Sequence, residues 1–240
     1  MPQKKALIIG CTSGIGLELT YQMIEKGYIV GGTGKREDVL IELDKEFSGH
    51  FHWCVFNSQD INTIKPTLSH MIKKMHGMDI CIIAAGTIGE NHNLQWAIDE
   101  KTIRTNVLGF TAIANFAAHY FLKTGSGHIV GISSLNKFFG SICHTSFNAS
   151  KAFISIYLEG LRNRMEKQKI YVTEICPGFL KTPSFDGFKE MLWIIPMKRA
   201  AKQIIKAIEH KKKIAYISKR WYITGWLLRL MPSFQKRIWQ

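Results

Sequence analysis

A glycine-rich turn near the start of the chain has the composition of a phosphate-binding loop. It reads GCTSGIG over residues 10–16 and follows an apolar run at residues 6–9. Such a turn lets the backbone approach a pyrophosphate, and the N-terminus of the next helix supplies N–H donors and a positive dipole end. The GxxxGxG spacing after the first apolar run favours a dinucleotide site over a simple tight turn. We expect phosphate contacts from Gly10, Thr12, Ser13, Gly14, Ile15 and Gly16.

The end of the second apolar run discriminates between the two nicotinamide cofactors. An acidic side chain there would accept a hydrogen bond from the ribose 2′-hydroxyl of NAD, whereas a basic side chain suits the 2′-phosphate of NADP. This chain has Lys35 and Arg36, and the acids Glu37 and Asp38 follow only after them. We therefore expect NADP(H) as the cofactor. The alternative is that the two cations are simply solvated at the start of a helix.

Short apolar runs alternate with longer segments of helical periodicity along most of the chain. The apolar runs, which we interpret as buried strands, are residues 6–9, 29–32, 51–56, 80–85, 129–132, 172–176 and 214–217. The helical segments are residues 15–26, 38–47, 61–76, 94–122, 147–167 and 198–210. This alternation predicts an α/β protein with a three-layer Rossmann fold, built on a doubly wound, mainly parallel seven-stranded sheet.

The chain shows no repeat or linker that would mark a second large domain. We expect one nucleotide-binding and catalytic domain over residues 1–218 and a basic amphipathic segment over residues 219–240. Within the domain, residues 183–197 are apolar without a clear period, as expected for a substrate lid.

Positive charge is concentrated at the C-terminal end. The 240 residues carry 32 Lys and Arg against 18 Asp and Glu, a net charge of +14, and 46% of them are hydrophobic. This hydrophobic content is enough for a buried core, which excludes intrinsic disorder. Residues 189–240 hold 13 of the cations and two acids, so the preceding 188 residues are nearly neutral.

Cysteine spacing and the N-terminal sequence favour a cytoplasmic location. The five cysteines form no CxxC pair, which is typical of a reduced protein and not of a metal site. The first residues lack the apolar stretch of a signal peptide, and no run approaches the roughly 20 apolar residues that span a bilayer. We expect a cytoplasmic protein without a metal.

Four further positions complete a pattern in the middle of the chain. Asn106 lies in TNVLG, Ser134 precedes Phe147 by 13 residues, and Lys151 follows Phe147 by four, on the same helix face. With the glycine turn, these motifs make residues 4–218 resemble the short-chain dehydrogenase/reductase family. The resemblance implies hydride transfer between NADP(H) and a carbonyl or hydroxyl group, as in a ketoreductase or alcohol dehydrogenase.

The resemblance also implies a role for each of the four positions. Ser134 would polarise the substrate oxygen, Lys151 would hold the nicotinamide ribose, and Asn106 would support a water that relays protons to the lysine. The family's proton-exchanging tyrosine is Phe147 here, which keeps the ring and loses the proton. The favoured account is an engineered Tyr-to-Phe variant of an active enzyme. The alternatives are a natural non-catalytic NADP(H)-binding or scaffolding protein, and another proton donor, for which His144 is the first choice.

Three other segments are implied to contact the cofactor. The PGxxxT turn at residues 177–182 supplies its proline, its glycine and its threonine. Residues 83–86 read IAAG and stand where the family has NNAG. They lack both asparagines, which is typical of a divergent branch. The further predicted contacts are Asn57, Ala84, Ala85, Gly86, Asn106, Lys151, Pro177, Gly178 and Thr182.

The C-terminal segment has the composition of an interfacial membrane element. Residues 219–240 hold five Lys or Arg and no acid, interleaved with Trp and Leu. We expect peripheral contact with the cytoplasmic membrane face; covering of the core and a subunit interface are alternatives, and nucleic acid is disfavoured. The tail also resembles the branch of decaprenylphosphoryl 2-keto-ribose reductases, which implies a lipid-linked carbonyl substrate beside the small-molecule one. The family resemblance implies a homo-oligomer, a dimer or a tetramer.

Overall fold

Seven parallel strands form one sheet in the order β3-β2-β1-β4-β5-β6-β7. The computed structural model describes residues 3–180, 194–218 and 221. The strands are β1 (Lys5–Ile9), β2 (Ile29–Gly34), β3 (Phe51–Val55), β4 (Ile80–Ile83), β5 (Ser126–Ile132), β6 (Lys169–Pro177) and β7 (Ile214–Ile217). The predicted doubly wound, seven-stranded parallel sheet is therefore confirmed.

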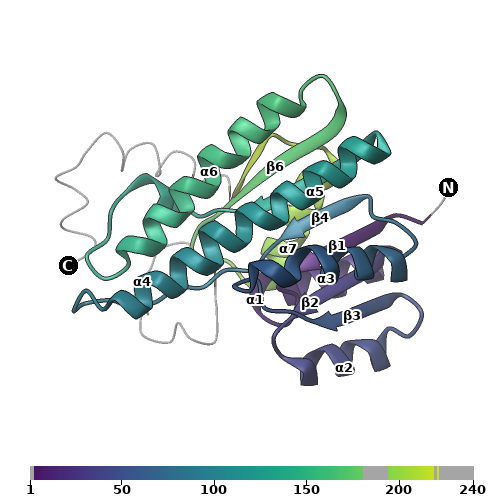
Figure 1. Cartoon of the computed structure of the whole chain (residues 1–240), viewed down its shortest axis with the longest axis horizontal. Helices are drawn as coiled ribbons and strands as arrows, with labels where there is room; N and C mark the ends of the chain where they lie inside the picture. The colour runs from purple at the N-terminus through teal and green to yellow at the C-terminus, as the bar shows by residue number, and fades with distance from the viewer. Residues whose placement is uncertain (1–2, 181–193, 219–220, 222–240) are drawn as a thin grey trace.

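Helices cover both faces of the sheet (Figure 1). They are α1 (Gly14–Glu25), α2 (Glu37–Glu46), α3 (Ile61–Lys74), α4 (Trp96–Ile103), α5 (Phe110–Thr124), α6 (Thr145–Met165) and α7 (Met197–Glu209). One buried apolar cluster joins α1, α2 and α7 to the sheet, and a second joins α3, α5 and α6 to the opposite face. These two clusters form the three-layer core, because the central strands of the sheet are buried on both sides.

The strand order reverses beside β1. This strand pairs with β2 on one side and with β4 on the other. The chain therefore continues from β1 to one side of the sheet and later returns to the other side of β1 at β4. In a parallel sheet the loops that follow such strands separate and leave a crevice at the carboxyl edge. The glycine turn after β1 and the IAAG segment after β4 therefore meet at this edge.

The expected single helix over residues 94–122 is wrong. The chain forms α4, then a π-helical stretch η1 (Arg104–Gly109), and then α5. Gly109 passes so close to the loop after β3 that a Cβ there would lie 2.3 Å from the carbonyl oxygen of Ser58. Gly109 is the last residue of the π-helical stretch, and such stretches occur frequently at functional sites. Asn106 lies within it.

Among the described residues, no helix combines the length and apolar character that a bilayer span requires.

Candidate active site

A cleft of about 530 Å³ opens at the carboxyl edge of β1, β2 and β4. It brings together three segments that the sequence assigned to cofactor binding, namely the glycine turn, the end of β2 and the loop after β4. The predicted residues that line it are Gly10, Thr12, Ser13, Gly14, Ile15, Gly16, Lys35, Arg36, Ala84, Ala85 and Gly86.

Two glycines of the turn are required by close backbone packing. Gly10 has φ +89°, and a Cβ there would lie 2.6 Å from the backbone nitrogen of Ala85. A Cβ on Gly16 would lie 2.0 Å from the carbonyl oxygen of Gly10. The start of α1 therefore sits directly against the end of β1, which leaves its first N–H groups facing the cleft.

Three cations line one part of the cleft. Lys35 and Arg36 were expected there, and Lys101 of α4 joins them. Burial and the neighbouring charge of Lys101 lower the pKa of the Lys35 ammonium. Arg36 also lies 4.0 Å from the exposed Asp38 carboxylate. Sequence reasoning missed Lys101, since a lone lysine on a helix carries no local signal of its position.

The loop after β3 contributes different residues from the one expected. Asn57 is exposed and does not line the cleft; its side-chain oxygen accepts a hydrogen bond from the Gln59 backbone N–H at 3.2 Å. Gln59 does line the cleft, and its amide donates to the Thr105 hydroxyl at 2.8 Å. The further lining residues that the sequence did not indicate are Ile9, Thr33, Gly34, Phe56, Ser58 and Thr87.

Asn106 is fixed by backbone and side-chain hydrogen bonds in η1. Its amide donates to the Thr87 carbonyl at 2.9 Å and to the Ser150 hydroxyl at 3.0 Å, and its oxygen accepts from the Thr87 N–H at 2.9 Å. A Cβ added to Gly86 would lie 3.5 Å from the Asn106 oxygen and 3.6 Å from Lys151 Nζ. Asn106 and Lys151 therefore approach each other beside the loop that follows β4.

Lys151 lies beneath the ring of Phe147 on the first turns of α6. Its side chain is buried, Nζ donates to the carbonyl oxygen of Ile132 at 3.0 Å, and Nζ is 5.5 Å from the Phe147 ring centroid. The i, i+4 spacing places both side chains on one helix face, as predicted. Phe147 offers no hydroxyl for the ammonium to contact.

Burial lowers the pKa of the Lys151 ammonium from 10.5 to about 8. Between these values the unfolded chain binds more protons than the folded chain, so stability rises with pH over that range. We expect the stability gained by Lys151→Met relative to the unsubstituted chain to be largest below pH 8. This gain should fall by about 3 kcal/mol as the pH rises to 10.5. Urea unfolding at several pH values measures it.

The exposed Lys123 provides the matched control for this measurement. Lys123→Met removes a lysine that is not buried, so it relieves no burial of an ammonium and serves as the reference for Lys151→Met. If the effect of Lys151→Met on the free energy of unfolding does not change with pH, burial of the Lys151 ammonium does not destabilise the fold.

Ser134 lies at the end of β5, where it caps a short 3-10 helix, η2 (Leu135–Phe138). Its hydroxyl oxygen accepts from the Asn136 backbone N–H at 3.2 Å, and the residue is only partly buried. Its neighbour Ser133 is fully committed elsewhere, because its hydroxyl lies 2.6 Å from the Glu174 carboxylate. Of the two adjacent serines, Ser134 is therefore the one available to a substrate.

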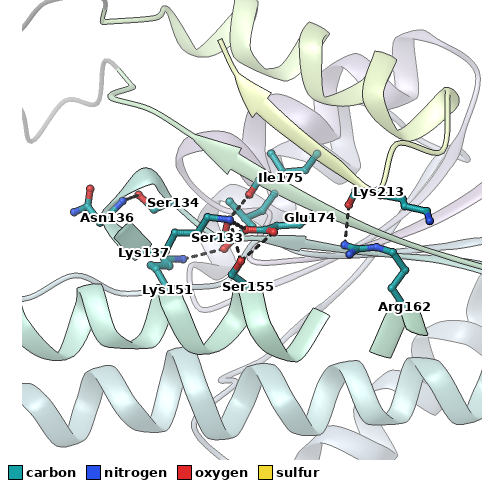
Figure 2. A network of polar contacts seen from close by, with 11 residues as sticks. Ser133, Ser134, Asn136, Lys137, Lys151, Ser155, Arg162, Glu174, Ile175 and Lys213 are labelled. Carbon is teal, nitrogen blue, oxygen red and sulfur yellow. Dashed lines mark hydrogen bonds and ion pairs between the residues drawn. The ribbon is translucent and has the colours of Figure 1, made fainter. Parts of the chain in front are cut away.

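A buried ion pair underlies this part of the site (Figure 2). Lys137 Nζ lies 2.6 Å from the Glu174 carboxylate, which also accepts hydrogen bonds from Ser133 and Ser155. Figure 2 shows these three side chains pointing toward Glu174 from η2, the end of β5 and α6. The network joins the elements that carry Ser134 and Lys151. The sequence did not indicate this network, because Lys137 and Glu174 lie 37 residues apart in the chain.

The turn after β6 lies outside the described lining of the cleft. Pro177 ends β6, and the Gly178 N–H donates to the Ile217 carbonyl at 2.7 Å. A Cβ on Gly178 would lie 2.3 Å from Nε1 of Trp221, so this glycine accommodates the indole. Thr182 and most of the predicted lid at residues 183–197 lie outside the described residues.

Residues 4–193 match the family described as short chain dehydrogenase. The chain belongs to the short-chain dehydrogenase family of oxidoreductases. An uncharacterized oxidoreductase of Myxococcus xanthus is 30% identical over 187 residues, which are 76% of this chain and 74% of the relative.

Two solved structures share the fold of this short-chain dehydrogenase. A variant of actinorhodin polyketide ketoreductase with NADPH superposes with a TM-score of 0.80 at 20% identity, over 90% of this chain and 94% of the other. A Tyr-to-Phe variant of ElxO with NADPH bound gives a TM-score of 0.80 at 19% identity, over 90% and 96% of the two chains. These similarities confirm the Rossmann architecture that the sequence predicted.

Proposed function

We propose that this short-chain dehydrogenase binds NADPH and reduces a ketone, with low turnover because Phe147 occupies the position of the proton donor. The observation that carries the proposal is Lys151, a buried ammonium held 5.5 Å from the centre of a ring that has no hydroxyl. Burying an ammonium is unfavourable unless it is compensated. A phenol on this ring would be a partner for it, and the cation would lower the pKa of the phenol.

The described residues of the cleft fit a dinucleotide phosphate. Gly10 and Gly16 leave the backbone free of side chains where α1 begins, and Thr33 Oγ1, also on the lining, is buried without a hydrogen-bond partner among the described residues. Lys35 and Arg36 supply charge for a 2′-phosphate. When bound, NADPH supplies the hydride; the protein's part is to orient the substrate and move the proton.

Ser134 and Lys151 handle the substrate oxygen and the proton in this proposal. The Ser134 hydroxyl can donate to a carbonyl oxygen, since its own oxygen already accepts from Asn136. Lys151 and Asn106 lie on the route by which a proton would be resupplied, and Asn106 is held in place by Thr87. A carbonyl substrate is supported by the similarity to actinorhodin polyketide ketoreductase.

We expect this chain to bind NADPH more tightly than NADH. Replacing Lys35, Arg36 or Lys101 by alanine should each reduce that preference by about tenfold, because each removes a charge-assisted contact of about 1.5 kcal/mol or more. Calorimetric titration with both cofactors measures the ratio of dissociation constants.

Lys45→Ala is the matched control, since Lys45 is an exposed lysine of α2 that does not line the cleft. The ratio of the NADH and NADPH dissociation constants for Lys45→Ala should equal that of the unsubstituted chain. An unchanged ratio in all three cleft variants would remove the argument for NADP.

Phe147 also favours a second candidate function, a natural NADP(H)-binding protein without catalysis. The Tyr-to-Phe variant of ElxO has NADPH bound, which supports cofactor binding by a chain of this fold that has lost a tyrosine hydroxyl. Under this alternative, NADPH would bind and no ketone would be reduced, even when a phenol is supplied at position 147. Turnover by Phe147→Tyr therefore separates the two functions.

Assembly as a homo-oligomer is part of the proposal. Large apolar side chains remain exposed on α5 and α6, including Leu122, Phe153 and Ile156. A second copy of the chain would cover them. Sedimentation velocity should give twice or four times the monomer mass, and a monomer at micromolar concentration would contradict it.

The sheet indicates where the catalytic domain ends. We propose residues 1–218 as one catalytic domain, since β7 completes the sheet. The membrane contact and the lipid-linked substrate stay predictions, because the structure describes only Trp221 within residues 219–240.

A further inference from the structure

Two loops outside the nucleotide cleft are held together where α6 begins. The Asn91 backbone N–H donates to the Cys143 carbonyl at 2.7 Å. Nδ1 of His144, the N-cap of α6, donates to the Gly89 carbonyl at 3.1 Å. These contacts fix residues 89–92, which follow β4, against the residues that lead into α6. The side chains on the two loops therefore have a defined separation.

Cys143 faces a histidine across this junction. Its Sγ lies 3.3 Å from Nδ1 of His92, and Nε2 of the same ring lies 3.8 Å from the Glu90 carboxylate. The carboxylate favours a proton on Nε2, which leaves Nδ1 as the acceptor for the thiol proton. Cys143 is only partly buried and the His92 side chain is 61% exposed. A small molecule in solution can therefore reach the sulfur.

Cys143 also lies close to the start of a long helix. It lies two residues before Thr145, the first residue of the 21-residue helix α6, near the positive end of the helix dipole. A metal does not account for the cluster, because no three His, Cys, Asp or Glu side chains in the described part of the chain are arranged to hold one.

The other four thiols are held in their neutral form. Burial raises the pKa of Cys11, Cys81 and Cys176 to about 12 and that of Cys54 to about 11. Nucleophilic attack requires the thiolate, so these four should react slowly. Reaction at Cys143 can thus be followed in the unmodified chain.

We propose that Cys143 and His92 form a reactive thiol site, at the start of the helix that carries Phe147, that exchanges with small disulfides. His92 Nδ1 accepts the thiol proton, and the Cys143 thiolate attacks one sulfur of the disulfide. A new S–S bond forms as the original one breaks, and the leaving thiolate takes up a proton. The Cys143 sulfur is oxidised and the leaving sulfur is reduced, so no further oxidant is required.

The adduct would lie outside the nucleotide cleft. None of the described cleft-lining residues belongs to residues 89–92 or 141–144. Cys143 precedes Phe147 by four residues, so a bulky group on its sulfur would lie near the part of α6 assigned to the substrate. Modification should therefore leave NADPH binding intact. This inference concerns the thiol alone and does not depend on the proposed reductase activity.

The experiment treats the full native chain with 5,5′-dithiobis(2-nitrobenzoate) and locates the adduct by peptide mass spectrometry. We expect one rapidly reacting thiol, at Cys143, and its loss in Cys143→Ser. His92→Gln should lower the second-order rate constant about tenfold, because the thiol loses the imidazole nitrogen that accepts its proton. His119→Gln is the control, since His119 lies on α5 and contacts the Asn115 carbonyl. Oxidised glutathione should form its mixed disulfide at the same cysteine, Cys143.

Two results would overturn the proposal: a fast adduct at Cys54, or equal rates in His92→Gln and the native chain. Circular dichroism and the melting temperature establish that each variant is folded. Glu90→Gln provides a second variant that leaves the cysteine and histidine in place, and it should lower the rate by a smaller factor than His92→Gln.

Discussion

Replacing Phe147 by tyrosine is expected to raise the rate of ketone-dependent NADPH oxidation about 10²- to 10⁴-fold, the usual contribution of a positioned general acid. The reason is the buried Lys151 ammonium, 5.5 Å from the ring centroid, which would lower the pKa of the new phenol. The other predicted catalytic positions, Ser134 and Asn106, are unchanged in this variant. Absorbance at 340 nm with a panel of ketones, including lipid-linked sugars, measures the rate.

The matched control is Phe153→Tyr, which adds a phenol to the same helix at an exposed position. It should leave the rate unchanged. Adding Lys151→Met to Phe147→Tyr should remove most of the gained activity, since the phenol then loses its cation. A folded Phe147→Tyr variant that binds NADPH but is no faster than the unsubstituted chain would favour the non-catalytic function.

Replacing Gly16 by alanine is expected to weaken NADPH binding about 10²-fold and to destabilise the fold by about 2 kcal/mol or more. The added Cβ would lie 2.0 Å from the carbonyl oxygen of Gly10, so α1 must move away from the end of β1. That movement displaces the N–H groups at the start of the helix, which are proposed to bind the cofactor phosphate. Urea unfolding and calorimetric titration measure the two effects.

Gly160 provides the control for this substitution. It lies inside α6 with no heavy atom within 4 Å of an added Cβ. Gly160→Ala should therefore stabilise the chain by about 0.5–1 kcal/mol and leave NADPH binding unchanged. Equal effects of the two alanines on binding would show that the turn does not hold the cofactor.

The features predicted most closely from the sequence depend on residues near one another in the chain. The glycine turn combines a strand, three glycines and a helix within a short segment, and Phe147 and Lys151 share one helix face. Such patterns depend on local backbone geometry and helical periodicity, so they can be recognised without knowing the tertiary packing. The strands β5 and β6 start three residues earlier than expected, because polar residues at their beginnings carry no apolar signal.

The features that the sequence did not indicate depend on distant parts of the chain. Lys101 reaches the cleft beside Lys35 because α4 packs there, and nothing around either residue shows that they meet. The Lys137–Glu174 pair joins η2 to β6 in the same way. The break in the 94–122 helix coincides with the close approach of Gly109 to Ser58. Each of these outcomes is decided by tertiary packing.

Isotope transfer tests whether this fold moves hydride from NADPH to a ketone. Phe147→Tyr is incubated with a ketone and NADPH carrying deuterium at both C4 positions, and the alcohol product is analysed by mass spectrometry. We expect one deuterium on the carbinol carbon of the product. An alcohol without deuterium, or no alcohol from a folded variant that binds NADPH, would contradict it.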